Sequence, residues 1–274
     1  MTVKLRAINF QGIAPGSIAV LKIPTGTPAG GQPSPTLDKL YFELSGGMTL
    51  AHITGIRGKI NGVIFYEEKN AATSIIRDQY RGLTVSTGLF QLDFTNPKAR
   101  NGAVEQLLTS LPLSEMQDLV FEFTIADDAP VGGRIEAEMH LRQPTKNPYI
   151  LKQLSTVQAF PNAGEQVIQL PVGNAGGKLL RIWLHESVPN NITKVEVRIG
   201  NTIVYESTVK RIEGSQIIND LVPQDAIVVV DFIEDGNLSG ALDTQKFSSV
   251  EVRLTGTAAA NYNVYYQYVD PIAK

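Results

Sequence analysis

The chain has 274 residues, no cysteine, and 24 Lys plus Arg against 27 Asp plus Glu, a formal net charge of −3. This length suits two domains of ordinary size. The balanced charge excludes a basic nucleic-acid-binding module, and the lack of cysteine excludes disulfides and thiolate chemistry. No apolar window is long enough to span a membrane or to serve as a signal-peptide core, so we expect a soluble product synthesised in the cytoplasm.

In the first half, short apolar-rich runs alternate with Gly, Pro, Asn and Asp clusters, a pattern typical of β-strands joined by turns. Residues 24–36 contain four prolines and three glycines and predict a surface loop. A helix is predicted over 98–110, before Pro112, and a further helical turn over 74–82. Strands are predicted near 5–11, 17–23, 39–44, 52–60, 62–67, 88–94, 118–125 and 133–141.

The second half follows a short link near 143–148 and shows the same type of pattern. A short helix is predicted over 235–245. Strands are predicted near 154–160, 166–170, 179–185, 192–199, 202–207, 226–232, 249–255 and 262–269.

Two hairpins in this pattern are copies of each other. Residues 53–67 and 192–206 align without gaps, 139 positions apart, and each contains a two-residue turn, Asn61-Gly62 or Gly200-Asn201. These dipeptides tolerate the positive φ of tight hairpin turns. The identical pairs are Ile53/Ile192, Thr54/Thr193, Ile60/Ile199, Ile64/Ile203, Tyr66/Tyr205 and Glu67/Glu206.

The correspondence continues in the same order on both sides of the hairpins, which indicates a tandem duplication. The matched blocks are 5–10 with 154–159, 16–26 with 164–173, 40–44 with 180–184, 92–94 with 230–232, 119–124 with 250–255 and 134–141 with 263–270. Eight strands per half with an inserted helix predict an all-β fold of two tandem eight-stranded jelly rolls, residues 1–146 and 147–274.

With its paired hairpins, the paired strands at 16–26 and 164–173 and the helix expected at 98–110, the chain resembles the double jelly-roll major capsid proteins of tailless, membrane-containing icosahedral phages of the corticovirus type. The resemblance is architectural and covers nearly the whole chain. It implies a structural protein of the virion that forms homotrimers of pseudo-hexagonal outline. It also implies contacts with neighbouring capsomers, a penton protein and membrane-associated virion proteins, and no direct contact with nucleic acid.

The residues offer no catalytic constellation, so we expect no enzymatic activity and no organic cofactor. His52, His140 and His185 are scattered and lack metal-ligand spacing. The acidic pairs Glu67-Glu68, Asp127-Asp128 and Glu234-Asp235 are interpreted as solvated loops and strand ends. Structural calcium at a subunit contact is the alternative, with Asp127, Asp128, Glu234 and Asp235 as candidate ligands.

Aromatic residues give a second indication of assembly. Trp183 has apolar neighbours and is predicted in a core or interface rather than on a sugar-stacking platform. A tyrosine cluster near the C-terminus must present rings on both sheet faces, which favours a strand covered on both sides, for example by a neighbouring subunit. Its members are Tyr262, Tyr265, Tyr266 and Tyr268.

Two other functions compete with the capsid hypothesis. A carbohydrate- or receptor-binding tandem jelly roll is the binding alternative, although secreted lectins usually carry a signal peptide. A cupin-like enzyme would need clustered histidines. The N-terminal residues 1–6 form either a short arm that faces the particle interior, where Lys4 and Arg6 meet anionic lipid, or the start of the first strand.

Overall fold

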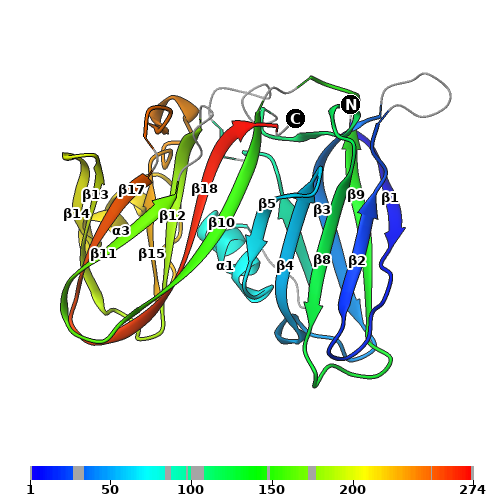
Figure 1. The fold of residues 1–274 in the computed structure, drawn as a ribbon, viewed down its shortest axis with the longest axis horizontal. Helices are drawn as coiled ribbons and strands as arrows, with labels where there is room; N and C mark the ends of the chain where they lie inside the picture. Colours follow the sequence, from blue (N-terminus) through cyan, green and yellow to red (C-terminus); the bar gives the residue numbers. More distant parts are fainter. Residues whose placement is uncertain are drawn as a thin grey trace.

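The computed structural model describes residues 2–26, 34–83, 88–96, 98–99, 108–146, 149–171, 177–247 and 249–272, with only the backbone for residues 2–6. Figure 1 shows two β-sandwiches side by side with their strands running in roughly the same direction. The fold is a double jelly roll.

The first jelly roll has eight main strands in two sheets, ordered β1-β9-β3-β6 and β2-β8-β4-β5. A two-residue strand, β7 (Leu111–Pro112), adds to the edge of β3. The main strands are β1 (Thr2–Asn9), β2 (Ile18–Ile23), β3 (Thr36–Ser45), β4 (Ile53–Ile60), β5 (Val63–Glu68), β6 (Leu89–Asp93), β8 (Leu119–Ile125) and β9 (Arg134–Arg142).

The second jelly roll repeats this topology as β10-β18-β12-β15 and β11-β17-β13-β14. A short strand, β16 (Leu242–Asp243), adds to β12 as β7 does to β3. The main strands are β10 (Tyr149–Phe160), β11 (Gly164–Pro171), β12 (Lys178–Glu186), β13 (Ile192–Ile199), β14 (Thr202–Thr208), β15 (Ile227–Asp231), β17 (Ser249–Gly256) and β18 (Ala260–Pro271). All sixteen predicted strands are confirmed.

One sheet runs through both jelly rolls. Strand β5, at the edge of the first jelly roll, lies parallel to β10 of the second, with Tyr66 opposite Gln153. The sheet β2-β8-β4-β5 therefore continues into β10-β18-β12-β15 (Figure 1). The two halves are joined by backbone pairing as well as by the short link. The boundary at 146/147 stays a prediction, because residues 147 and 148 lie outside the described part.

Irregularities of the ladders confirm the duplication. The β4–β5 register shifts between Gly58 and Lys59, and the β13–β14 register shifts 139 positions later, between Val197 and Arg198. Both hairpins turn where predicted, yet the turns differ. In the first turn both central residues have positive φ (Asn61 51°, Gly62 77°), as in a type I′ turn. In the second turn only Gly200 does, as in type II′.

One block of the predicted alignment is displaced by two residues. Strand β3 shifts register against β9 between Leu37 and Lys39, and β12 shifts against β18 between Leu179 and Arg181. Lys39 pairs with Asp93 as Arg181 pairs with Asp231. The strands therefore match at Lys39/Arg181 and Tyr41/Trp183, and the alignment of 40–44 with 180–184 is wrong. Alternating apolar residues allow such a two-residue slip because it keeps every side chain on its face.

Each jelly roll has its own hydrophobic core between its two sheets. The first core is rich in phenylalanine, with Phe42, Phe121 and Phe123 fully buried. The second is built mainly from Val, Leu and Ile, such as Val195 and Val252. The chain is long enough to bury two such cores, so each half can be stabilised by its own apolar burial.

Two α-helices occupy equivalent places after the two hairpins. Helix α1 (Ala72–Tyr80) is longer than the single turn predicted over 74–82, and α3 (Val209–Ile218) was not predicted. The helix predicted over 98–110 falls mostly outside the described residues. The prediction of a helix over 235–245 is wrong, because this segment contains a 3₁₀ turn, Leu238–Gly240, and the short strand β16. Two further 3₁₀ turns are Leu50–His52 and Leu113–Glu115.

The N-terminal segment is part of the sheet and not a free arm. Its backbone from Thr2 onward forms β1, with Thr2 opposite Arg142 and Val3 opposite Leu141 of β9. The loop predicted over 24–36 lies outside the described part at residues 27–33. No described helix is long and apolar enough to cross a bilayer.

Candidate assembly site at the junction of the two jelly rolls

The junction begins with helix α1, which belongs to the first jelly roll but packs on the outer face of the β10-β18-β12-β15 sheet of the second (Figure 1). Tyr80 of α1 meets Trp183 of β12 edge to face, with ring centroids 4.9 Å apart. Both side chains are fully buried. The cluster also contains Leu221, Ile227, Val229 and Tyr265, with Ile76 of α1 at its edge. The second jelly roll therefore has apolar residues on both faces of one sheet.

A buried ion pair lies beside this cluster. Arg77 of α1 contacts Glu68 of β5 at 2.5 Å between Nη2 and Oε2, with side chains 6% and 0% exposed. The same guanidinium nitrogen donates to the Tyr66 hydroxyl at 2.8 Å, and that hydroxyl donates to Glu68 at 3.2 Å. Thr73 also donates to the Glu68 carboxylate. A charge this deeply buried is tolerable only when it is paired and hydrogen-bonded. Both oxygens of the Glu68 carboxylate have partners, whereas Arg77 Nη1 has none among the described residues.

Side chains of the second jelly roll complete this network. Gln153 of β10 donates to Glu68 Oε2 at 3.0 Å and to the Glu67 carbonyl at 3.1 Å. Gln267 of β18 in turn donates to Gln153 Oε1 at 2.9 Å. Ser155 donates to the Glu67 carboxylate at 2.8 Å. The hydrogen-bond chain thus runs from α1 through β5 and β10 to β18, across the boundary between the halves.

A second buried pair stabilises the far end of α1. Arg181 of β12 contacts Asp231 of β15 at 2.7 Å, and Tyr80 donates to the same carboxylate at 3.2 Å. The Tyr80 carbonyl also accepts a hydrogen bond from the Val222 amide at 2.8 Å. The C-terminal end of helix α1 is therefore tied to the second jelly roll by packing and by hydrogen bonds.

Burial and charge shift the pKa values of these groups strongly. Burial by itself would lower the pKa of Arg77, but the adjacent Glu68 carboxylate raises it above the usual value. Burial raises the pKa of Tyr66 and Tyr80. Burial, helped by the Arg77 charge, lowers the pKa of His185 to about 3. At neutral pH the junction therefore holds a neutral His185 and neutral tyrosines around the Glu68–Arg77 pair.

The structure settles the interpretation of the aromatic residues. Trp183 is buried at an interface, as predicted, but the interface lies within the chain. The tyrosines are covered on both sheet faces, as predicted: Tyr262, Tyr266 and Tyr268 face the second core, and Tyr265 faces the junction. The proposed cover by a neighbouring subunit is wrong for Tyr265, because α1 of the same chain supplies it. None of these rings is a sugar-stacking platform.

The acidic pairs have different roles. Glu68 is fully buried, so the interpretation of Glu67-Glu68 as a solvated strand end is wrong for this residue. Asp127 and Asp128 are exposed in the turn between β8 and β9, as predicted. Glu234 accepts a hydrogen bond from Ser215 at 2.5 Å, and Asp235 accepts one from the Asn237 amide at 2.9 Å.

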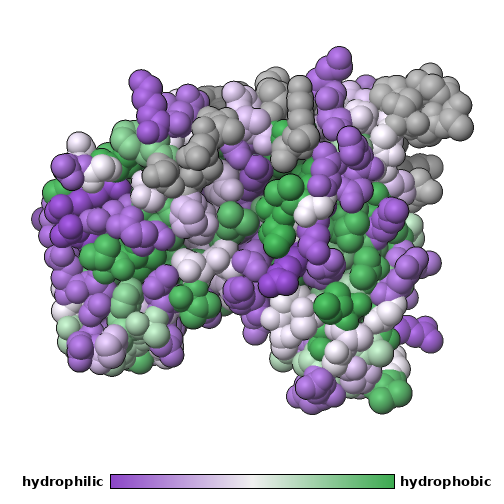
Figure 2. Space-filling view, viewed as in Figure 1, coloured by the Kyte–Doolittle hydropathy of each residue, from purple (hydrophilic) through white to green (hydrophobic). Residues whose placement is uncertain are grey.

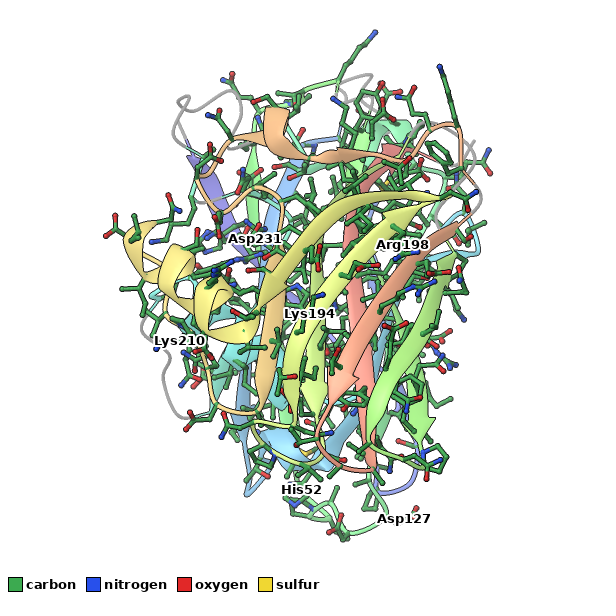
Figure 3. All side chains as sticks on the ribbon, turned by 90° about the vertical axis from the view of Figure 1, so that its left-hand side faces the viewer. His52, Asp127, Lys194, Arg198, Lys210 and Asp231 are labelled. Carbon is green, nitrogen blue, oxygen red and sulfur yellow. The ribbon has the colours of Figure 1, made fainter. Side chains whose placement is uncertain are left out.

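The calcium candidates do not meet within one chain. Figure 3 shows Asp127 at the lower end of the molecule, far from Asp231, which lies three residues before Glu234. Among the described residues, no three His, Asp or Glu side chains are close enough to share a metal ion. Calcium at a contact between subunits stays a prediction.

The histidines are as scattered as the sequence indicated. His52 ends a 3₁₀ turn, where its Nδ1 accepts a hydrogen bond from the Thr49 amide at 3.0 Å. His140 lies on β9 with its ring 4.4 Å from that of Tyr41. His185 packs edge to face on Tyr265, 5.0 Å between centroids. The last of these belongs to the junction.

Sequence reasoning missed the Glu68–Arg77 network and the role of α1. The only signal was the strand alternation of β5, which places Glu68 on the same face as the aromatic Tyr66. That face looks toward the first core, because Glu68 pairs with the buried Ile56 and Tyr66 belongs to the core cluster. What the junction does physically is hold two jelly rolls in one rigid orientation.

Comparisons with solved structures match this architecture. The major capsid protein P2 of bacteriophage PM2 superposes with a TM-score of 0.86, with 16% identity over 99% of each chain. The STIV MCP follows at 0.69, with 12% identity over 97% of this chain and 96% of that one. The Faustovirus major capsid protein superposes with a TM-score of 0.62, with 8% identity over 98% of this chain and 90% of that one. The fold is that of the double jelly-roll capsid proteins.

Family comparisons identify the group within this class. The model of the viral coat protein P2 N-terminal domain matches residues 4–142, and that of the C-terminal domain matches residues 150–272. The chain belongs to the viral coat protein P2 family and is a structural protein of a viral capsid. A comparison with curated protein sequences found no match.

Proposed function

We propose that this chain is the major capsid protein of a PM2-like phage and that three copies form one capsomer of pseudo-hexagonal outline. The observation that carries the proposal is the junction itself. It joins unlike edges, β5 of the first jelly roll to β10 of the second. The strand equivalent to β5 is β14, and the strand equivalent to β10 is β1. Each is the last strand of its described sheet. A heterologous contact of this kind can repeat and close into a ring.

Because the junction is rigid, one chain can supply two of the six jelly rolls that surround the axis of a capsomer. Hydrogen bonds between buried side chains and a shared sheet keep the two jelly rolls at a constant angle, so three chains present six similar blocks around one axis. Such capsomers tile an icosahedral shell over an internal membrane and contact neighbouring capsomers, a penton protein and membrane-associated virion proteins. The proposed role needs no catalytic group and no organic cofactor.

The end of the molecule that carries both chain termini (Figure 1) is proposed to face the membrane. Lys4 and Arg6 of β1 would there meet anionic headgroups, each contributing up to about 1 kcal/mol. Deletion of residues 1–6 would remove part of β1, so the test uses Lys4→Ser with Arg6→Ser. The variant should float less with anionic vesicles than the wild type at low salt. Equal flotation would contradict this orientation.

Light scattering coupled to size-exclusion chromatography tests the capsomer directly. The expected mass is about 90 kDa, three times the 29.8 kDa of the chain. A stable monomer or twofold dimer at micromolar concentration, at the pH and salt of assembly, would contradict the proposed function.

A further inference from the structure

We infer that helix α3 and strand β14 of one copy dock on the outer face of the β1-β9-β3-β6 sheet of a second copy, as α1 and β5 dock on the second jelly roll within the chain. This inference rests on the proposed trimer and names the surfaces that build it. Figure 2 shows hydrophilic and hydrophobic side chains mixed over the visible face of the molecule, so hydropathy alone does not locate the contact. The internal repeat of the chain locates this contact.

The receiving face is identified by register. The pairing of the ladders makes Tyr41 equivalent to Trp183, Leu89 to Ile227 and Glu138 to Tyr265. Trp183, Ile227 and Tyr265 are the residues of the second jelly roll that α1 covers. Their counterparts in the first jelly roll line a hollow on its outer face, together with Glu43 and Glu136. The site that α1 fills on one jelly roll is thus an open hollow on the other.

The docking helix is identified in the same way. Helices α1 and α3 end on the same hydrogen bonds, from the Leu83 amide to the Asp78 carbonyl and from the Leu221 amide to the Gln216 carbonyl. Ile218 is therefore the counterpart of Tyr80, which packs on Trp183. Ile217 is 62% exposed and its neighbour Ile218 is 81% exposed. Two adjacent isoleucines in water are unfavourable unless a partner covers them. The helix is therefore poised to bury on a second copy the position that α1 buries within the chain.

Charge supports the same pairing. Lys210 and Arg211 are both exposed in the first turn of α3, where the helix dipole disfavours cations (Figure 3). These residues lie on the exposed face with Ile217 and Ile218, at helical spacing. The hollow on the receiving sheet is lined by three carboxylates, Glu43, Glu136 and Glu138. A basic helix end and an acidic hollow are complementary, which favours this register of docking over a twofold contact of like faces.

The exposed residues of the edge strand β14 support the same docking as helix α3. In β5, Phe65 and Tyr66 are buried, 1% and 6% exposed. Their counterparts in β14 are Val204, which is 39% exposed, and Tyr205, which is half-buried. Within the described residues β14 pairs only with β13, and β1 with β9 apart from a contact at its end with β2. An unpaired edge needs a cover or a partner, and β1 of the next copy is the equivalent of β10.

Disulfide trapping tests the docking, because the chain contains no cysteine of its own. Ile218→Cys combined with Leu89→Cys replaces the counterparts of Tyr80 and Ile227, which share one buried cluster within the chain. Mild oxidation should convert most of the protein to a covalent trimer on non-reducing gels. The matched control combines Ile218→Cys with Val131→Cys, because Val131 is 89% exposed in the turn between β8 and β9. It should give no covalent trimer.

A charge-reversal pair provides an independent measurement. Lys210→Glu with Arg211→Glu should weaken trimer formation at least about tenfold, and adding Glu43→Lys with Glu138→Lys should restore it in part. If trimers form but do not cross-link, and if charge reversal does not change their stability, the proposed docking is wrong while the proposed function still holds. A monomeric wild type would overturn both.

Discussion

The junction makes a quantitative prediction for the Glu68–Arg77 pair. Substitution Arg77→Met removes the cation from a carboxylate whose side chain is 0% exposed and keeps much of the arginine volume. Loss of one partner of such a buried pair costs about 3–5 kcal/mol, because the remaining charge stays desolvated. A chain of this size loses about 2–4 °C of Tm per kcal/mol, so Tm should fall by about 6–20 °C.

The double variant separates the pair from simple packing loss. Glu68→Gln with Arg77→Met removes both charges, so it should be more stable than Arg77→Met alone, with a coupling energy of at least about 2 kcal/mol. The fluorescence of Trp183 is a direct assay, because this sole tryptophan lies in the junction cluster. All samples need one protein concentration, since assembly contributes to stability.

An exposed ion pair serves as the control. Lys194 and Glu206 form a pair between β13 and β14 (Figure 3) with side chains 42% and 45% exposed. Solvent screens this pair, so Lys194→Met should lower the stability far less than Arg77→Met does. The interpretation of the junction fails if Arg77→Met lowers the free energy of unfolding no more than Lys194→Met does. It also fails if the loss in the double variant equals the sum of the losses in Glu68→Gln and Arg77→Met alone.

Two further predictions concern pH and core packing. The unfolded chain protonates His185 near pH 6.5 but the folded chain only near 3, so stability falls as pH drops below 6.5. Between pH 7 and 5 the wild type should lose about 2 kcal/mol more than His185→Phe, and equal losses in urea titrations would contradict the shift. In Gly58→Val, the new Cβ would lie 2.8 Å from carbons of both Phe65 and Phe121. This overpacking should cost about 1–3 kcal/mol, and Phe121→Val should recover part of it, because the second jelly roll pairs Val197 with Val252; no recovery in thermal melts would contradict this explanation.

The sequence by itself was sufficient for the strands, the hairpins and the duplication. Alternation of apolar and polar residues is a local signal, and a sandwich with one buried face per sheet reproduces it in each strand. Turn dipeptides such as Asn61-Gly62 need only the conformational freedom of their own backbone. Even so, the two-residue slip between the strands of Lys39 and Arg181 went undetected, because period-two patterns look the same after such a shift.

Helix α3 shows where local signals fail. Its sequence contains Gly214 and the β-branched residues Val209, Ile212, Ile217 and Ile218, which lower helix propensity. Its helical state comes from tertiary packing, with Ile212 in the second core and Gln216 bonded to the Val229 carbonyl at 2.7 Å. The equivalent helix α1 was detected only as a turn for a similar reason.

Only the tertiary structure decided the roles of the residues at the junction. Trp183 and Tyr265 lie on a face that would be solvated in a single jelly roll, and each is buried because α1 of the other half covers it. Glu68 lies on the edge strand β5, where β10 of the other half supplies a hydrogen-bond partner. The partners that satisfy Glu68 are distant in sequence, since Gln153 is 85 positions away. Periodicity reports which face of a strand is apolar, whereas the contact between two domains depends on how whole sheets are placed against each other.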